Sequence, residues 1–257
     1  MRYSAKQTSI TWREEFEMHT RVARRARPGR VLAAILTGAL PLLVTDGLHS
    51  AQAASGVGAL VASAEHNTNT VRTLVHRDQD TITMPSQNVT ITANGSEDEV
   101  HNREQDYESV TVVGRTGSTK GKKLHYTIDI IFLNGMTYYR VSTLGKAWKS
   151  QKGMTFPDPY TGGWKRGRTT VSFPKTVTFH EVGTSGGETH VRATLPGTTV
   201  AGTADLWISG GAQPYVVRED ENYHTVKGAR ASEQTHVLFG PFNTPIVITA
   251  PSSQSST

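Results

Sequence analysis

The 257-residue sequence contains no cysteine. No disulfide can therefore stabilise the fold, and no thiol is present to carry a lipid anchor. The chain also lacks a concentrated block of charge beyond its first 53 residues. That segment holds eight Lys and Arg and four Asp and Glu, which leaves 19 basic and 18 acidic residues in the rest. This near balance argues against a nucleic-acid-binding protein, because such a protein needs a basic footprint on its folded domain.

The first 53 residues have the pattern of an export signal. Five arginines within residues 21–30 precede an apolar run over residues 31–44, which is too short to cross a bilayer comfortably. The small residues of Ala51-Gln52-Ala53 then predict cleavage before Ala54. The alternative is an uncleaved membrane anchor held by the positive charges. We expect export across the cytoplasmic membrane to the cell envelope or beyond, with the segment either removed or retained as a tether.

Residues 54–251 are expected to form one domain, followed by a disordered tail over residues 252–257. Val57, Leu60, Val61 and Ala64 have helical spacing and predict one short amphipathic helix. The sequence that follows is typical of strands separated by Gly, Asn, Asp and Pro. The closing stretch, residues 245–249, is apolar and β-branched and predicts a last strand between two prolines.

The strongest hairpin signal is Asn134-Gly135, because a type I′ turn needs positive φ at both central positions. A two-residue loop there places Ile130 opposite Tyr139 and, on the other face, Asp129 opposite Arg140.

Two further hairpins are predicted later in the chain. In residues 205–218 the expected pairs are Ile208 with Tyr215, Leu206 with Val217 and Asp205 with Arg218, with Trp207 and Val216 on the polar side. In residues 177–195, one face collects the apolar residues and the other carries His180 and His190 as neighbours across the hairpin.

Several of these stretches resemble the LolA/LolB-like and LppX/LprG-like envelope proteins. The closing FGPFNTPIVITAP is similar to the ending of that group, and NGMTYYRVSTLGKAWKS is similar to its hairpin of strand, Gly, Tyr-containing strand and Gly-Lys-Trp. FHEVGTSGGETHVRATL and ADLWISGGAQPYVV also follow its order. The lipid-anchor cysteine of many members is absent, and residues 147–170, where relatives place lid helices, have no helical period and predict a loop.

The resemblance implies a mainly β fold, a strongly curved antiparallel half-barrel whose concave face holds acyl chains or other apolar cargo. The alternative for the same residues is an ordinary closed core, in which each buried side chain contributes about 1.5–3 kcal/mol. The candidate lining residues are the apolar ones on the inward faces of two hairpins: Tyr126, Ile128, Ile130, Phe132, Tyr139, Val141, Leu206, Ile208, Tyr215 and Val217.

Three basic loops, two of which carry tryptophan, are candidates for contact with an anionic membrane surface. The alternative is that they are solvated hairpin tips with an aromatic ring folded back onto the protein. The residues concerned are Lys122, Lys123, Lys146, Trp148, Trp164, Lys165 and Arg166.

No pattern in the sequence predicts catalysis. The GTSGG of residues 183–187 matches the nucleophile-elbow pattern, but a strand follows it where that motif requires a helix, so we interpret it as a turn. Two histidines do not complete a metal site. We therefore expect a monomeric binding protein without enzyme activity, metal or cofactor, whose partner is a lipid or apolar small molecule. The alternative is a sensor or structural module that contacts protein partners through the same sheet.

Overall fold

The structure is a computed structural model. The predicted signal peptide, residues 1–53, and the last five residues of the predicted tail lie outside the part of the chain that it describes. The described residues are 56–153, 155–156, 164–165, 171–173, 177–195, 197, 200–228 and 230–252.

The described chain forms one open antiparallel sheet of 11 strands, a separate two-stranded ribbon (β7 with β8) and one α-helix, α3 (Val57–Asn69). The predicted mainly β, curved half-barrel with few helices is thereby confirmed. The strands are β1 (Thr73–Thr83), β2 (Gln87–Asp98), β3 (Arg103–Gly114), β4 (Lys123–Leu133), β5 (Met136–Val141), β6 (Lys149–Lys152), β7 (Thr155–Phe156), β8 (Trp164–Lys165), β9 (Phe179–Ser185), β10 (Glu188–Leu195), β11 (Val200–Ser209), β12 (Val216–Thr225) and β13 (Ser232–Phe242).

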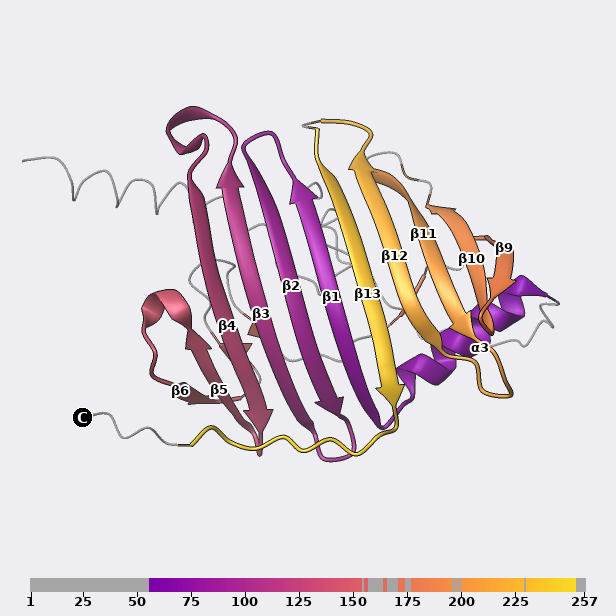
Figure 1. Cartoon of the computed structure of the whole chain (residues 1–257), viewed down its shortest axis with the longest axis horizontal. Helices are drawn as coiled ribbons and strands as arrows, with labels where there is room; N and C mark the ends of the chain where they lie inside the picture. The colour runs from indigo at the N-terminus through magenta and orange to yellow at the C-terminus, as the bar shows by residue number, and fades with distance from the viewer. Residues whose placement is uncertain are drawn as a thin grey trace, which may run out of the picture.

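The sheet consists of two meanders joined at its centre. Strands β1 to β6 follow one another to one edge, and β13 back to β9 follow one another to the other edge. The join is the antiparallel pairing of β1 with β13 (Figure 1). The earliest and latest strands of the described chain are thus neighbours in the middle of the sheet.

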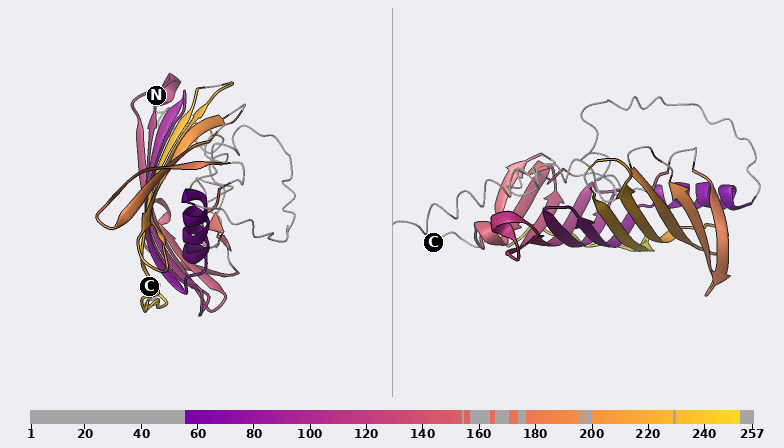
Figure 2. Two further views of the ribbon diagram at one scale, coloured as in Figure 1. Left: turned by 90° about the vertical axis from the view of Figure 1, so that its right-hand side faces the viewer. Right: turned by 90° about the horizontal axis from the view of Figure 1, so that it is seen from above.

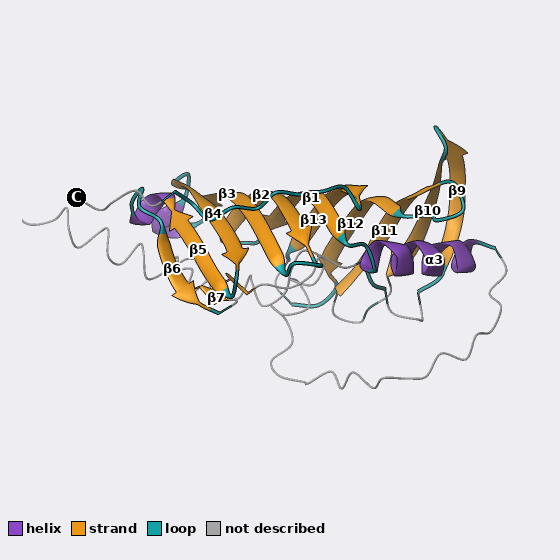
Figure 3. Cartoon of the chain, turned by 90° about the horizontal axis from the view of Figure 1, so that it is seen from below, coloured by secondary structure: helices purple, strands orange, loops and turns teal. Residues whose placement is uncertain are grey.

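Helix α3 lies on the side toward which the sheet curves, beneath the end formed by β9 to β12 (Figures 2 and 3). We call this side the inner face and the opposite side the outer face. The Thr68 hydroxyl accepts a hydrogen bond of 2.9 Å from the Val216 backbone N–H, and the Asn69 side chain bonds the backbone of Val171 in both directions. Val61 and Ala64 are buried, so the predicted amphipathic helix is confirmed and packs by its apolar side.

The β4–β5 hairpin has the predicted register. Asn134 and Gly135 both have positive φ, Ile130 pairs with Tyr139, and Asp129 pairs with Arg140. The Arg140 guanidinium donates to Asp129 Oδ2 at 2.9 Å on the outer face. Here the two-residue turn determines every later pair.

The predicted register of the β11–β12 hairpin was wrong. A bulge between Trp207 and Ile208 makes Ile208 pair with Val216, and Trp207 then pairs with Arg218. Leu206 faces Glu219 instead of Val217. The extra residue of a bulge shifts all later partners, which a simple alternation cannot anticipate. Val216, expected on the polar side, is fully buried.

The two histidines of the β9–β10 hairpin are not neighbours across the strands. A second register shift pairs His190 with Gly183 and His180 with Arg192. Gly186 and Gly187 form the turn with positive φ, which confirms the interpretation of the GTSGG motif.

The predicted closing strand was also wrong. Residues 243–252 continue after β13 as an extended segment outside any strand and run along the ends of β1 to β4 (Figure 1). Asn243 ties its start to β1, since its backbone N–H donates to the Thr73 carbonyl and its side-chain oxygen accepts from Arg72 N–H. Pro245 and Pro251 lack the N–H that a ladder needs. Ile248 is buried, whereas Val247 is exposed.

Candidate functional site

The inner face carries two buried apolar clusters, one in each half of the sheet. Cluster 1 belongs to β1 to β5, and cluster 2 belongs to β1, α3 and β10 to β13, together with Val71 and Val171. Cluster 1 comprises Ile82, Val89, Val110, Val112, Tyr126, Ile128, Ile130, Phe132 and Val141; cluster 2 comprises Val61, Ala64, Val71, Leu74, Val171, Val191, Leu206, Ile208, Val216, Val237 and Phe239.

The candidate lining residues are divided between these clusters. Five of those on the β4–β5 hairpin belong to cluster 1, and Tyr139 packs against it. Leu206 and Ile208 belong to cluster 2, and Tyr215 packs against it. Val217 belongs to neither cluster and is half-buried beside the bulge. The single inner surface expected from the sequence is therefore divided into two parts.

A band of buried carboxylates separates the two clusters. Along β1 the inward positions run from Leu74 of cluster 2, through His76, Asp78 and Asp80, to Ile82 of cluster 1. The same alternation brings acids inward on β2, β3, β12 and β13. Together they are Asp78, Asp80, Glu97, Glu104, Asp106, Glu219, Glu221 and Glu233.

His76 is the only buried basic side chain among the described residues. Its Nδ1 lies 3.2 Å from both carboxylate oxygens of Asp78, and its Nε2 lies 3.7 Å from Asp106 Oδ1 and 3.7 Å from Glu97 Oε1. Burial opposes protonation, but the hydrogen bond and charge of Asp78, with the charges of Asp106 and Glu97, raise the pKa of His76 to about 9. The imidazole is therefore a cation at neutral pH.

Two acids near α3 have raised pKa values. Burial raises the pKa of Glu65 to about 7, although a hydrogen bond from the Phe173 backbone acts in the opposite direction. Burial and the neighbouring charges of Glu221 and Glu65 raise the pKa of Glu219 well above its ordinary value. These shifts follow from placing several carboxyl groups in a low-dielectric region with one cation.

The sequence signal for this band was present but was missed. Acids alternate in RDQD, REQDYE and REDE with the same period of two that places apolar residues inward on the same strands. Because inward positions were expected to be apolar, no prediction was made for these residues. Such a band could have been predicted from charged residues that occupy the inward positions of a strand whose other inward positions are apolar.

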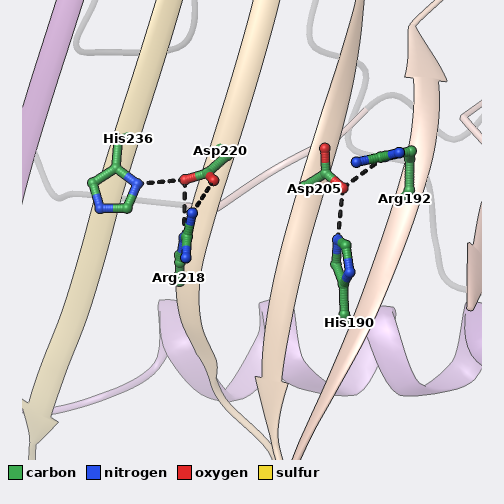
Figure 4. Close-up of polar contacts among 6 residues, drawn as sticks. All are labelled: His190, Arg192, Asp205, Arg218, Asp220 and His236. Carbon is green, nitrogen blue, oxygen red and sulfur yellow. Dashed lines mark hydrogen bonds and ion pairs between the residues drawn. The ribbon is translucent and has the colours of Figure 1, made fainter. Parts of the chain in front are cut away.

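The outer face carries a second polar arrangement, across β10 to β13 (Figure 4). Asp205 and Asp220 are directly opposite each other on β11 and β12. Asp205 Oδ1 lies 2.6 Å from His190 Nε2 and accepts from Arg192 Nε at 2.7 Å. Asp220 is held in the same way by Arg218 and His236. Burial alone would raise the pKa of Asp220, but these two partners lower it.

Trp207 lies between the two halves of this outer network. The His190 ring stacks on it at 4.3 Å between centroids, and the Arg218 guanidinium lies 4.0 Å over it. His180 is exposed, whereas His190 is half-buried, so only the former is an ordinary surface histidine. Each carboxylate has its own arginine and histidine partners, which is typical of a stabilising ladder. The described residues contain no group of His and acids arranged to hold a metal ion.

The candidate membrane-contact residues come from three separate stretches of the chain. Lys122 and Lys123 stand at the start of β4, whereas Lys146 and Trp148 lie between β5 and β6. The Arg140 guanidinium lies 5.0 Å over the half-buried Trp148 ring, as expected for an aromatic side chain folded back onto the protein. Trp164 and Lys165 form β8, and Arg166 lies outside the described residues. No described helix is long and apolar enough to cross a membrane.

Comparisons with known proteins give likenesses at low identity. No family model matches the chain, and no curated protein matches it. The Mycobacterium tuberculosis lipoprotein LppX is 11% identical, with a TM-score of 0.41 over 74% of this chain and 97% of its own. LprF from Mycobacterium bovis is 13% identical, with a TM-score of 0.42 over 75% and 95%. LppX is a named member of the group that the sequence motifs resemble, but TM-scores of this size transfer neither ligand nor function.

Proposed function

We propose that this chain is an exported, non-enzymatic binding protein that holds a lipid or another apolar molecule against the inner face of its sheet. The observation that carries the proposal is that the apolar inner face extends well beyond the part of it that α3 covers. Cluster 1 extends over five strands, yet α3 lies at the opposite end of the sheet and contacts β9 and β12. Within the described chain, no α-helix covers this half, although β7 of the two-stranded ribbon contacts β5.

Binding would be driven by removing acyl chains from water. Ile128, Ile130 and Phe132 are adjacent inward positions of β4 and are fully buried in the structure, so a ligand would reach them only by displacing their present cover. Removing apolar surface from water contributes about 25 cal/mol per Å². A curved wall of branched and aromatic side chains can therefore retain an apolar molecule without covalent chemistry.

The first test is direct. The protein, secreted from a bacterial host, is purified without detergent, extracted with organic solvent and examined by mass spectrometry alongside native mass spectrometry of the intact protein. Lipid bound in a fixed ratio is the expected result. A protein that is repeatedly free of lipid and does not bind an apolar probe would overturn the proposal and favour a module that contacts protein partners.

The second test uses two neighbouring isoleucines on opposite faces of β4. Ile130 faces inward, whereas Ile131 is buried on the outer face opposite Tyr138. Titration with the fluorescent probe 1-N-phenylnaphthylamine should show at least about tenfold weaker binding for Ile130→Trp, which corresponds to roughly 1.4 kcal/mol. Ile131→Trp should stay within about twofold of the unaltered protein at the same precision. If both variants weakened probe binding equally, the probe would not bind at the inner face of β4.

The basic loops enter the proposal as a contact with anionic membranes. Lys122, Lys123 and Lys146 are exposed, and a lysine near an anionic surface contributes about 1 kcal/mol. Sedimentation with phosphatidylglycerol vesicles should exceed that with phosphatidylcholine vesicles, and replacing the three lysines by Ala should remove the difference. Equal sedimentation with both vesicles would remove this part of the proposal.

A further inference from the structure

A single glycine brings two charged side chains of the inner face together across an intervening strand. In register, His76 on β1 pairs with Gly95 on β2, which pairs with Asp106 on β3. A Cβ at Gly95 would lie 2.0 Å from His76 Nε2 and 2.3 Å from Asp106 Oδ1. Any other residue would therefore occupy the space where these two groups meet.

Each of the two groups has an unused hydrogen-bonding atom. His76 is 5% exposed and Asp106 is 7% exposed, and neither His76 Nε2 nor Asp106 Oδ1 makes a hydrogen bond. The two atoms are 3.7 Å apart, which is too long for a hydrogen bond between them. A buried polar atom left without a hydrogen bond is costly, so a pair of them calls for a bridging group.

The protonation of the imidazole defines what that group must be. Nδ1 is directed at Asp78, and the raised pKa of about 9 keeps the proton on Nε2 at neutral pH. Nε2 is then a donor and the Asp106 carboxylate is an acceptor. The bridging group must accept from one and donate to the other.

We propose that His76 and Asp106, meeting above Gly95, bind a hydroxyl group of the apolar ligand. A hydroxyl is both acceptor and donor. An anionic head group would meet the charges of Asp78, Asp106 and Glu97, and an ammonium group would meet the cationic imidazole and has no acceptor atom. A neutral, hydroxylated head group satisfies both atoms without adding charge.

This inference rests on the proposed function. The register of β3 and β4 places the polar pair next to the apolar residues of cluster 1. Asp106 pairs with Ile130 of cluster 1, so the polar pair borders the apolar wall directly. A ligand with its chain on cluster 1 would place its head group at the band of carboxylates. The ligand class is therefore an amphiphile with a neutral, hydroxyl-bearing head, such as a monoacylglycerol.

The test compares two probes that share one chain and differ in the hydroxyl groups. Monopalmitoylglycerol and methyl palmitate compete with 1-N-phenylnaphthylamine for the full chain at pH 7. We expect the hydroxylated probe to bind at least about tenfold more tightly, because the methyl ester leaves the buried pair without a partner. The preference should decline above pH 9, as the imidazole loses its proton.

Two variants locate the preference. Gly95→Ala fills the space between the two groups and should reduce the preference to about one while the fluorescent probe still binds. Gly183→Ala is the matched control, because a Cβ at this strand glycine meets nothing within 4 Å, and it should retain the preference. If Gly95→Ala does not fold, Asp106→Asn replaces it in the same competition and should also reduce the preference. In the unaltered protein, the imidazole N–H resonance of His76 should then shift with monopalmitoylglycerol but not with methyl palmitate.

The outcomes separate the two proposals. Probe binding with equal competition by the two palmitoyl compounds overturns the hydroxyl site, indicates that a buried water bridges the pair, and leaves the proposed function intact. A preference that persists in Gly95→Ala also overturns the site. No binding of any apolar probe overturns the proposed function itself.

Discussion

The two faces of the sheet treat charge in opposite ways. On the outer face, Asp205 and Asp220 each accept from an arginine and lie beside a histidine, Asp205 buried and Asp220 partly exposed. On the inner face, the described residues include eight buried carboxyl groups and one buried histidine. The outer arrangement stabilises the strands as many surface ladders do. The inner arrangement makes the stability of the fold depend on the charge of His76.

The largest expected difference between the faces comes from removing a histidine on each. His76→Leu leaves Asp78 and Asp106 buried without their cation and should lower the free energy of unfolding by about 3–5 kcal/mol. His236→Leu removes a half-exposed partner of Asp220 and should cost under about 1 kcal/mol. Urea unfolding at pH 7 measures both, and equal costs would show that the faces do not differ.

A second difference concerns alkaline pH. The folded pKa of His76, about 9, lies above its ordinary value of 6.5, so its contribution is complete below pH 6.5 and is lost as pH rises through 9. The free energy of unfolding should fall by at most about 3 kcal/mol over this window. Urea midpoints from pH 6 to 10 test this, with His76→Leu as the control that should lack the fall.

A smaller effect is expected at acid to neutral pH, with opposite signs on the two faces. The folded pKa of Glu65, about 7, lies above 4.5, so the folded state retains a proton that the unfolded state loses, and stability should fall between pH 4.5 and 7. Glu65→Gln should recover roughly 1 kcal/mol at pH 8, a figure reduced for solvent screening.

On the outer face the sign reverses. The lowered pKa of Asp220 contributes stability above its ordinary value of 3.8 that is lost as pH falls through the folded pKa. Asp220→Asn should therefore flatten the acid limb of the stability curve, whereas Glu65→Gln should flatten the limb that leads toward neutral pH. At pH 8, Glu65→Gln should raise the free energy of unfolding and Asp220→Asn should lower it. A change of the same sign in both variants would contradict the assignment of these groups.

The smallest effect is expected for the outer ion pair of the β4–β5 hairpin. Arg140→Met removes the bond to Asp129 and the contact with the Trp148 ring, both partly exposed, and should cost about 0.5 kcal/mol. Most of this cost should vanish in 1 M salt, because a surface pair is screened. A salt-independent loss above about 2 kcal/mol would show that this pair behaves like the inner charges.

The sequence predicted those parts of the fold that local signals determine. Asn134-Gly135 determined a full hairpin register, and Val61 with Ala64 identified the buried side of α3. The register failed at β11–β12, because the bulge beside Trp207 depends on packing across several strands. Residues 245–249 have the composition of a strand, but Pro245 and Pro251 lack the N–H that a ladder needs, and the segment stays outside the sheet.

Much of the apolar wall was predicted from the sequence, whereas the polar pair within it was not. Alternation identified Ile128, Ile130 and Phe132 as inward-facing. The meeting of His76 with Asp106 depends on which strands become neighbours and on a glycine between them, and neither follows from one strand alone. Long-range pairing is the information that a single sequence did not supply.

The join between β1 and β13 has a consequence for how the molecule assembles. Each meander can form from contacts between consecutive strands, but this seam unites segments that are well over a hundred residues apart, and closing so large a loop is slow. Pairing of β1 with β13 is therefore the folding step that joins two half-sheets, each with an exposed edge, into one sheet. A chain that stalled there would present both unpaired edges to other copies of itself.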